Sequence, residues 1–207
     1  MKQSVWVFLF LLLSACSTAE RSSPDEVEII EVQPSPKTAR AKAGLAKMLE
    51  RHDVSVFLYT KKIQIQENVI SHSSPVLTLN AKYASQPETL LSILLHEEMH
   101  WFLMEHQAAI DAAVLELKSR YPKLPTGERL IARDEYSTYL HLVVCWLELQ
   151  LDRQFFGDEK ARAIIEGFEH YRWIYKTVLA DEDSIGKIVI FGKLIPPGLT
   201  LSNNRRD

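Results

Sequence analysis

The chain has 207 residues, of which 46% are hydrophobic and 25% charged, and its formal net charge is −3. These values are typical of an ordinary globular protein, and they exclude both an intrinsically disordered chain and a fibrous one. The slight acidic excess provides no broad basic surface of the kind that attracts nucleic acid. Nucleic acid is therefore not expected among the partners.

The N-terminus differs from this average, because Lys2 is followed by an apolar run over residues 5–13 and then by small residues. A run of about nine residues covers about 14 Å as a helix, well short of the roughly 30 Å hydrocarbon core of a bilayer. The sequence therefore favours a cleaved signal peptide over residues 1–15 rather than a membrane-spanning helix.

The cleavage region Leu13-Ser14-Ala15-Cys16 resembles the lipobox of bacterial lipoproteins, whose cysteine is lipidated and becomes the mature N-terminus. The resemblance implies a lipid anchor at Cys16 and a place in the bacterial cell envelope. Ser17 after the cysteine implies sorting to the outer membrane, facing the periplasm. An ordinary signal peptide with a cysteine nearby by chance is the alternative. If Cys16 carries lipid, Cys145 is left as a free cysteine and reads as a small buried hydrophobe.

The remainder divides into a tether and one domain. Residues 16–37 are polar and contain prolines, so a flexible lipidated tether is expected there, followed by a single domain over 38–207. Residues 38–52 are rich in Ala, Lys and Leu and predict a first helix. Enrichment in β-branched and aromatic residues predicts two paired strands over 54–59 and 63–70, and a third short strand over 76–80.

Helical patterns occupy most of the rest. Ser85 and Glu88 have capping-box spacing, with Pro87 between them, so a helix is expected to begin there and to run through residue 103. Further helices are expected over 107–121, 128–156 and 158–179, whereas 185–201 gives no clear assignment. The expected fold class is α+β: a small N-terminal β-sheet packed against a predominantly helical bundle.

The helix that begins near Ser85 contains the segment His96-Glu97-Glu98-Met99-His100. Two histidines four residues apart on a helix are separated by about 40° around its axis and about 6 Å along it, so both imidazoles can bind one ion. Glu97 lies about 100° further round, where a carboxylate reaches a metal-bound water without binding the metal. Because zinc lowers the pKa of bound water to about 7, the spacing predicts Zn²⁺ on His96 and His100, with Glu97 as general base.

This segment resembles the HExxH active-site helix of the zincin metallopeptidases, and the short strands upstream resemble the sheet that precedes it in that fold. The resemblance implies a zincin-like domain, the same two ligands and base, and a peptide or protein substrate. Glu98 departs from the family pattern, in which that position is usually uncharged. A chance HExxH in a surface helix is the alternative. The apolar residues on both sides of the motif argue against it, because they indicate a buried helix.

The stretch 128–156 carries a second set of polar residues at spacings of three and four: Asp134, Thr138, His141, Cys145, Glu148 and Asp152. They share one stripe about 80° wide on a helix that is otherwise largely apolar. The stripe is either a buried hydrogen-bond network, a solvent-facing strip, or the part of the metal site that faces the motif helix.

Residues 148–152 resemble the Glu-x-x-x-Asp pattern of the glutamate-type zincins, or gluzincins. The resemblance implies Glu148 as the third zinc ligand and Asp152 as the residue that orients a ligand histidine. His141 would then be free to stabilise the oxyanion of the reaction. His141 is also the rival third ligand, because imidazole binds zinc well. Glu135 is rotated by about 140° from Glu148 and is expected to face elsewhere.

The remaining histidines are weaker candidates. His52, His72 and His106 lie in polar or boundary contexts, where a surface position is expected. His170 and Tyr171 could donate a proton to the oxyanion, but their apolar neighbours equally suit a packed helix.

Three functions are compatible with these features. The first is a zinc-dependent metallopeptidase of the cell envelope. The second is a di-iron helical bundle, because Glu97-x-x-His100 is also an iron-binding spacing, but such a site takes two of these motifs and the chain has one. The third is a catalytically silent envelope lipoprotein that serves as a metal-binding or interaction module. Glu97 distinguishes the first from the third, because a purely structural zinc site has no use for a base beside its ligands.

Overall fold

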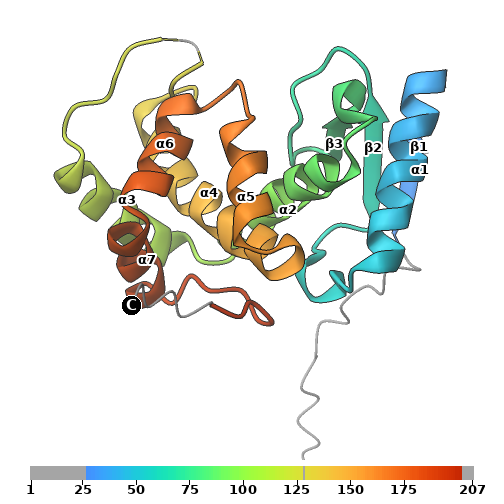
Figure 1. Ribbon diagram of the computed structural model, residues 1–207. Helices are drawn as coiled ribbons and strands as arrows, with labels where there is room; N and C mark the ends of the chain where they lie inside the picture. Colours follow the sequence, from blue (N-terminus) through green and yellow to red (C-terminus); the bar gives the residue numbers. More distant parts are fainter. Residues whose placement is uncertain (1–26, 128, 202–207) are drawn as a thin grey trace, which may run out of the picture.

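The computed structural model describes residues 27–127 and 129–201 (Figure 1). The expected signal peptide over 1–15 and the expected lipidation site, Cys16, lie outside these ranges and stay predictions. Within the described ranges, no helix has both the length and the apolarity needed to cross a bilayer.

The described residues form a mostly helical protein with one small sheet, which confirms a mixed helix-and-strand fold class. In chain order the strands and helices are β1 (Glu28–Glu31), α1 (Pro36–Arg51), β2 (Lys62–Gln66), β3 (Leu77–Asn80), α2 (Pro87–Met104), α3 (Gln107–Arg120), α4 (Glu135–Phe156), α5 (Asp158–Glu166), α6 (Arg172–Ala180) and α7 (Glu182–Phe191). Figure 1 shows the sheet and α1 at one end of the molecule, α3, α6 and α7 at the other, and α2 between them.

The sheet is three-stranded and parallel, in the order β1-β2-β3, and Ile63 of β2 pairs with Ile29 and Leu77. In β2 the buried Ile63 and Ile65 alternate with more exposed polar residues, so one face is apolar. Helix α1 packs on β1 and β2, and α2 packs on both β3 and α1. The two helices thus bury the apolar face and fix α2 relative to the sheet.

Two features of the N-terminal half differ from the sequence-based expectation. Part of the expected tether, Glu28–Glu31, is an edge strand of the sheet. The expected strand over 54–59 is instead a 3-10 turn, Ser55–Phe57, whose neighbours Val54 and Leu58 are buried with Phe57. Strand propensity largely reports how well a side chain suits a half-buried surface, and this loop satisfies the same preference without pairing.

The helix boundaries also differ in detail. Helix α2 begins at Pro87 with Gln86 as its N-cap and without a side-chain cap, so the capping box expected from Ser85 is not formed. Helix α4 begins later than residue 128, because the side chain of Asp134 caps it by accepting the amide of Ser137 at 2.7 Å. The helix expected over 158–179 is two helices, and Tyr171 between them has a left-handed φ of 57°.

Helix α4 is the centre of the helical part, since it packs against α2, α3, α5, α6 and α7. Its residues from 141 to 153 are all buried, which explains an apolar sequence on nearly all sides of the helix. From Thr138 to Asp152 the polar stripe of α4 consequently lies inside the protein, where each polar group needs a partner.

Packing between α4 and α7 gives a test of the fold. A Cβ at Gly186 of α7 would lie 2.8 Å from the Trp146 ring of α4, whose Nε1 donates to the carbonyl of Glu182 at 3.0 Å. We expect Gly186→Ala to lower the free energy of unfolding by about 1–3 kcal/mol, because the indole is 4% exposed and this hydrogen bond holds it in place. Urea denaturation measures this change.

Gly44→Ala is the matched control. A Cβ there would meet only the Cβ of Pro87, at 3.4 Å, and alanine favours the helical backbone by up to about 1 kcal/mol. Its stability should stay equal or rise. Equal stability of Gly186→Ala and the unmodified chain would contradict the close packing of α7 on α4.

Candidate metal centre

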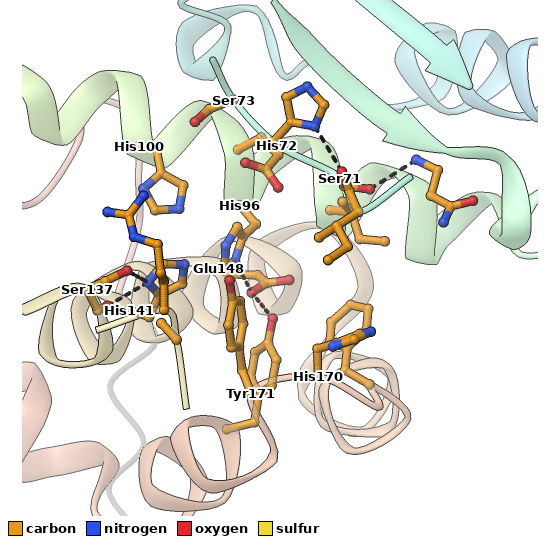
Figure 2. A pocket seen from close by; sticks show the side chains of 18 of the residues that line it. Ser71, His72, Ser73, His96, His100, Ser137, His141, Glu148, His170 and Tyr171 are labelled. Carbon is orange, nitrogen blue, oxygen red and sulfur yellow. Dashed lines mark hydrogen bonds and ion pairs between the residues drawn. The ribbon is translucent and has the colours of Figure 1, made fainter. Parts of the chain in front are cut away.

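Three imidazoles meet between helices α2 and α4. His96 and His100 come from α2 and His141 from α4, and each offers a ring nitrogen within 4.8 Å of the other two. The ring centroids of His100 and His141 are 4.9 Å apart, and those of His96 and His141 are 5.6 Å apart. Figure 2 shows the three rings grouped together on one side of a pocket. Three converging imidazoles form a group that could hold a divalent metal ion.

The orientation of His96 is set by Glu148. Nδ1 of His96 lies 2.8 Å from Oε2 of Glu148, which also accepts the hydroxyl of Tyr175 at 2.8 Å. Oε1 of Glu148 accepts the hydroxyl of Ser92 at 3.0 Å. With Nδ1 engaged in this way, Nε2 of His96 is the nitrogen left for a metal ion.

Asp152 lies behind Glu148 in the same network. Its Oδ2 is 2.6 Å from the hydroxyl of Ser92, and both carboxyl groups are fully buried. Burial, and then the nearby charge of Glu148, raise the pKa of Asp152 well above its usual value. A hydroxyl donates only one proton, so a protonated Asp152 satisfies the second contact of Ser92. Asp152 therefore acts on the site through Ser92 and Glu148, and no contact with a histidine is seen.

His141 is held by its own helix. Its Nδ1 lies 2.6 Å from the carbonyl oxygen of Ser137, which fixes the ring and leaves Nε2 free. Burial and the charge of His96 lower the pKa of His141 to about 3, and the same causes place the pKa of His100 well below its usual range. Both rings are therefore neutral, which is the state that binds metal ions.

His96 has the opposite electrostatic balance. Burial is the largest single influence and disfavours its charged form, but Glu148 and Cys145 together outweigh burial and raise the pKa of His96 well above the usual value. The carboxylate thus stabilises a positive charge on this ring, and a bound dication would provide that charge in place of the proton. Together with two neutral imidazoles, this arrangement fits a divalent metal ion.

Glu97 follows His96 on α2 and lines the same cleft, with 6% of its surface exposed. Burial raises the pKa of Glu97 to about 7. His96 lowers this pKa and Glu148 raises it, each by less than burial does. A carboxyl group with a pKa close to neutrality can both accept and return a proton at physiological pH.

Glu98, the acid that departs from the zincin pattern, points away from this cleft. Its Oε2 accepts the amides of Tyr59 and Thr60 at 2.7 and 3.2 Å, so it fixes the turn that precedes β2 against α2. Burial raises its pKa to about 8. This role depends on a contact across the fold, which is why the sequence motif does not reveal it.

The cleft above the three imidazoles has a volume of about 820 Å³. One wall is the segment 69–73, which is held beside β3 by an antiparallel bridge between His72 and Thr78. The other walls come from residues 131–133, from α4, and from residues 168–171 before α6. His72 is exposed, as expected from the sequence, and it lines the cleft, as does the exposed His170 (Figure 2).

Among the wall residues outside α4, Tyr171 places its ring against the imidazoles. Its ring centroid is 4.5 Å from that of His141, and its ring is stacked on His96 at 6.4 Å. Its left-handed backbone is uncommon for a bulky residue and is typical of functional sites. The sequence offered no signal for this conformation, because it arises where α5 and α6 fail to form one helix.

The predicted site residues therefore fall into distinct places. His96, Glu97, His100 and His141 line the cleft, and Glu148, which also lines it, contacts Nδ1 of His96. Glu148 also belongs to a second group of possible ligands with His96 and Cys145, all three buried. Glu135 faces away and pairs with Lys118 at 2.6 Å, while His52 and His106 lie outside the cleft lining.

Comparisons of this chain with protein-family models, with curated proteins and with solved structures find no match.

Proposed function

We propose that this chain is a zincin-like metallopeptidase that holds Zn²⁺ through His96, His100 and His141 and uses Glu97 as general base. The observation that carries the proposal is the convergence of three imidazoles from two helices in a cleft, next to a buried carboxyl group with a pKa of about 7. The third ligand in this proposal is His141 rather than Glu148, so the likeness to the zincins rests on the HExxH part and not on the glutamate-type extension.

The metal ion, when bound, would polarise a carbonyl group and make water acidic enough to lose a proton near neutral pH. Glu97 accepts the proton of the attacking water and later returns it to the departing amine. Glu148 keeps Nε2 of His96 directed at the metal, and the hydroxyls of Tyr175 and Ser92 hold Glu148 in place. Each residue thus has a role that follows from its contacts.

Tyr171 is the group best placed to stabilise the oxyanion. Its ring lies against His96 and His141 at the cleft wall, and burial raises the pKa of its phenol, so the proton is retained for donation. A hydrogen bond to the oxygen that gains charge in the transition state is a large contribution to catalysis. Tyr171 replaces His141 in this role, because His141 belongs to the ligand group.

The test is metal analysis of the purified chain together with a survey of peptide cleavage. We expect one zinc ion per chain, cleavage that stops when a chelator removes it, and recovery when zinc is restored. Zinc without cleavage of any peptide would favour the catalytically silent metal-binding module. A chain that takes up no metal, or cleaves peptides equally well in chelator, would contradict the proposal.

We propose a lipid anchor at Cys16, on the lipobox resemblance alone, which places the domain at a bacterial membrane surface. Cys16→Ser should abolish incorporation of a fatty-acid analogue during growth, because the thiol that accepts the lipid is gone. Cys145→Ser is the control, since Cys145 is fully buried in α4 and should leave labelling unchanged. Equal labelling of Cys16→Ser and the unmodified chain would refute the anchor.

A further inference from the structure

The charged side chains that line the cleft are divided between its floor and its mouth. Among the described residues there are four: Glu97, Glu148, Lys82 and Arg133. The two acids are 6% and 0% exposed and form part of the site at the floor. The two cations are more exposed, with 89% of the Arg133 side chain and 35% of the Lys82 side chain accessible. Among the charged residues of the lining, the cations are therefore the ones that lie nearer to solvent.

Arg133 keeps most of its hydrogen-bonding capacity. Its Nε donates to Oδ2 of Asp134 at 3.1 Å, while Oδ1 of Asp134 is committed to capping α4 through the amide of Ser137. Within the described residues, neither terminal nitrogen of the guanidinium has a hydrogen bond. These nitrogens form the fork that binds a carboxylate through two parallel hydrogen bonds.

The position of Arg133 brings this fork near the reacting centre. Arg133 immediately precedes the N-cap Asp134 of α4, and His141 lies seven residues after that cap, about 10 Å along the helix axis, in the same cleft lining. The neighbouring Ala132 is 7% exposed, which anchors the backbone at the cleft wall. Burial raises the pKa of Tyr171, and the positive charge of Arg133 lowers it by a smaller amount. The guanidinium is therefore close enough to the Tyr171 hydroxyl for its charge to affect that group.

Lys82, the other cation in the cleft lining, already has two partners for its ammonium group. Its ammonium lies over the ring of Tyr83 at 4.6 Å and 3.8 Å from a carboxylate oxygen of Glu169. The charge of Lys82 thus has two partners, and Arg133 is the more exposed of the two cations.

We propose that the cleft selects peptides carrying a carboxylate beside the cleaved bond, and that Arg133 recognises that carboxylate. This inference rests on the proposed peptidase function. A peptide carries carboxylates of two kinds that would fit: an acidic side chain within the peptide, and the free carboxylate at its C-terminus.

The experiment uses the full chain loaded with zinc and two matched peptide pairs. In the first pair a blocked peptide carries Glu or Gln next to the cleaved bond, and in the second the Gln peptide ends in a free acid or an amide. We expect kcat/KM to be about tenfold higher for the charged member of one pair, and that pair identifies the source. Arg133→Ala should abolish this preference, and Arg133→Lys should retain part of it.

Arg129→Ala is the matched control, because it removes the same charge from an exposed position in the same loop, outside the cleft lining. It should keep the preference. Cleavage of both members of each pair at equal rates by the unmodified chain would overturn the inference and leave the peptidase proposal intact. A preference that survives Arg133→Ala would also overturn it.

A binding measurement separates the inference from the proposed function. The zinc-loaded chain is titrated calorimetrically with two peptide hydroxamates that differ only in a carboxylate or a carboxamide. Tighter binding of the carboxylate form, lost in Arg133→Ala and kept in Arg129→Ala, supports the inference even if no peptide is cleaved, whereas the peptidase proposal would then fail. Equal binding of the two forms contradicts carboxylate recognition.

Discussion

Replacement of Glu97 by glutamine is expected to leave zinc bound and to lower peptide hydrolysis by about 10²–10⁴-fold, the usual contribution of a general acid or base. Glutamine keeps the shape of the side chain but cannot accept a proton. The three imidazoles do not include Glu97, so the metal should stay in place. Zinc content and kcat/KM, measured on the same preparation, check both parts.

Glu98→Gln is the matched control for this variant. It makes the same change one residue further along α2, but Glu98 faces the amides of Tyr59 and Thr60 instead of the cleft. We expect it to leave zinc content unchanged and to change the free energy of unfolding little at neutral pH, because Glu98, with a pKa of about 8, is largely neutral there and glutamine keeps an oxygen that can accept both amides. If Glu97→Gln hydrolysed peptides as fast as the unmodified chain, Glu97 would not be the base.

The parts of the site that one helix determines could be predicted from the sequence. The spacing of His96, Glu97 and His100 fixes their relative directions on α2, and the structure places all three at one cleft. The polar stripe of α4 also emerged from spacing alone. Its inner part does face α2, since Glu148 contacts His96 and Asp152 contacts Ser92. The inner part of the stripe is therefore both a buried hydrogen-bond network and the face of α4 that is turned toward α2.

The parts of the fold and site that depend on how helices and strands pack against one another could not be predicted from the sequence. Whether His141 or Glu148 joins the two motif histidines is decided by the position of α4 along α2, which periodicity does not report. Likewise, Glu28–Glu31 is too short and too acidic to be distinguished from a tether, and it becomes a strand only by pairing with β2. Tyr171 reaches the site through a chain reversal between α5 and α6 that has no residue signature, since its left-handed position is occupied by neither Gly nor Asn.

His141→Ala is expected to weaken zinc binding by more than about 100-fold, and Glu148→Ala by about 10–100-fold. The difference follows from the contacts: His141 offers a free Nε2 to the ligand group, whereas Glu148 contacts the far nitrogen of His96. Removal of a group that only orients a ligand typically costs about 10–100-fold in affinity, and loss of a ligand costs more. Competition with a chelator of known affinity measures both variants.

Two further variants make this comparison decisive. Glu148→Gln retains an oxygen that can accept Nδ1–H of His96, so it should lose less affinity than Glu148→Ala if Glu148 only orients the ring. His106→Ala removes an imidazole that lies outside the cleft lining, with its Nδ1 at 2.9 Å from the carbonyl of Phe102, and should leave zinc affinity unchanged. Release of the metal by Glu148→Ala together with its retention by His141→Ala would reverse the assignment. Glu148 would then be the third ligand, and the likeness to the glutamate-type zincins would extend to the whole ligand set.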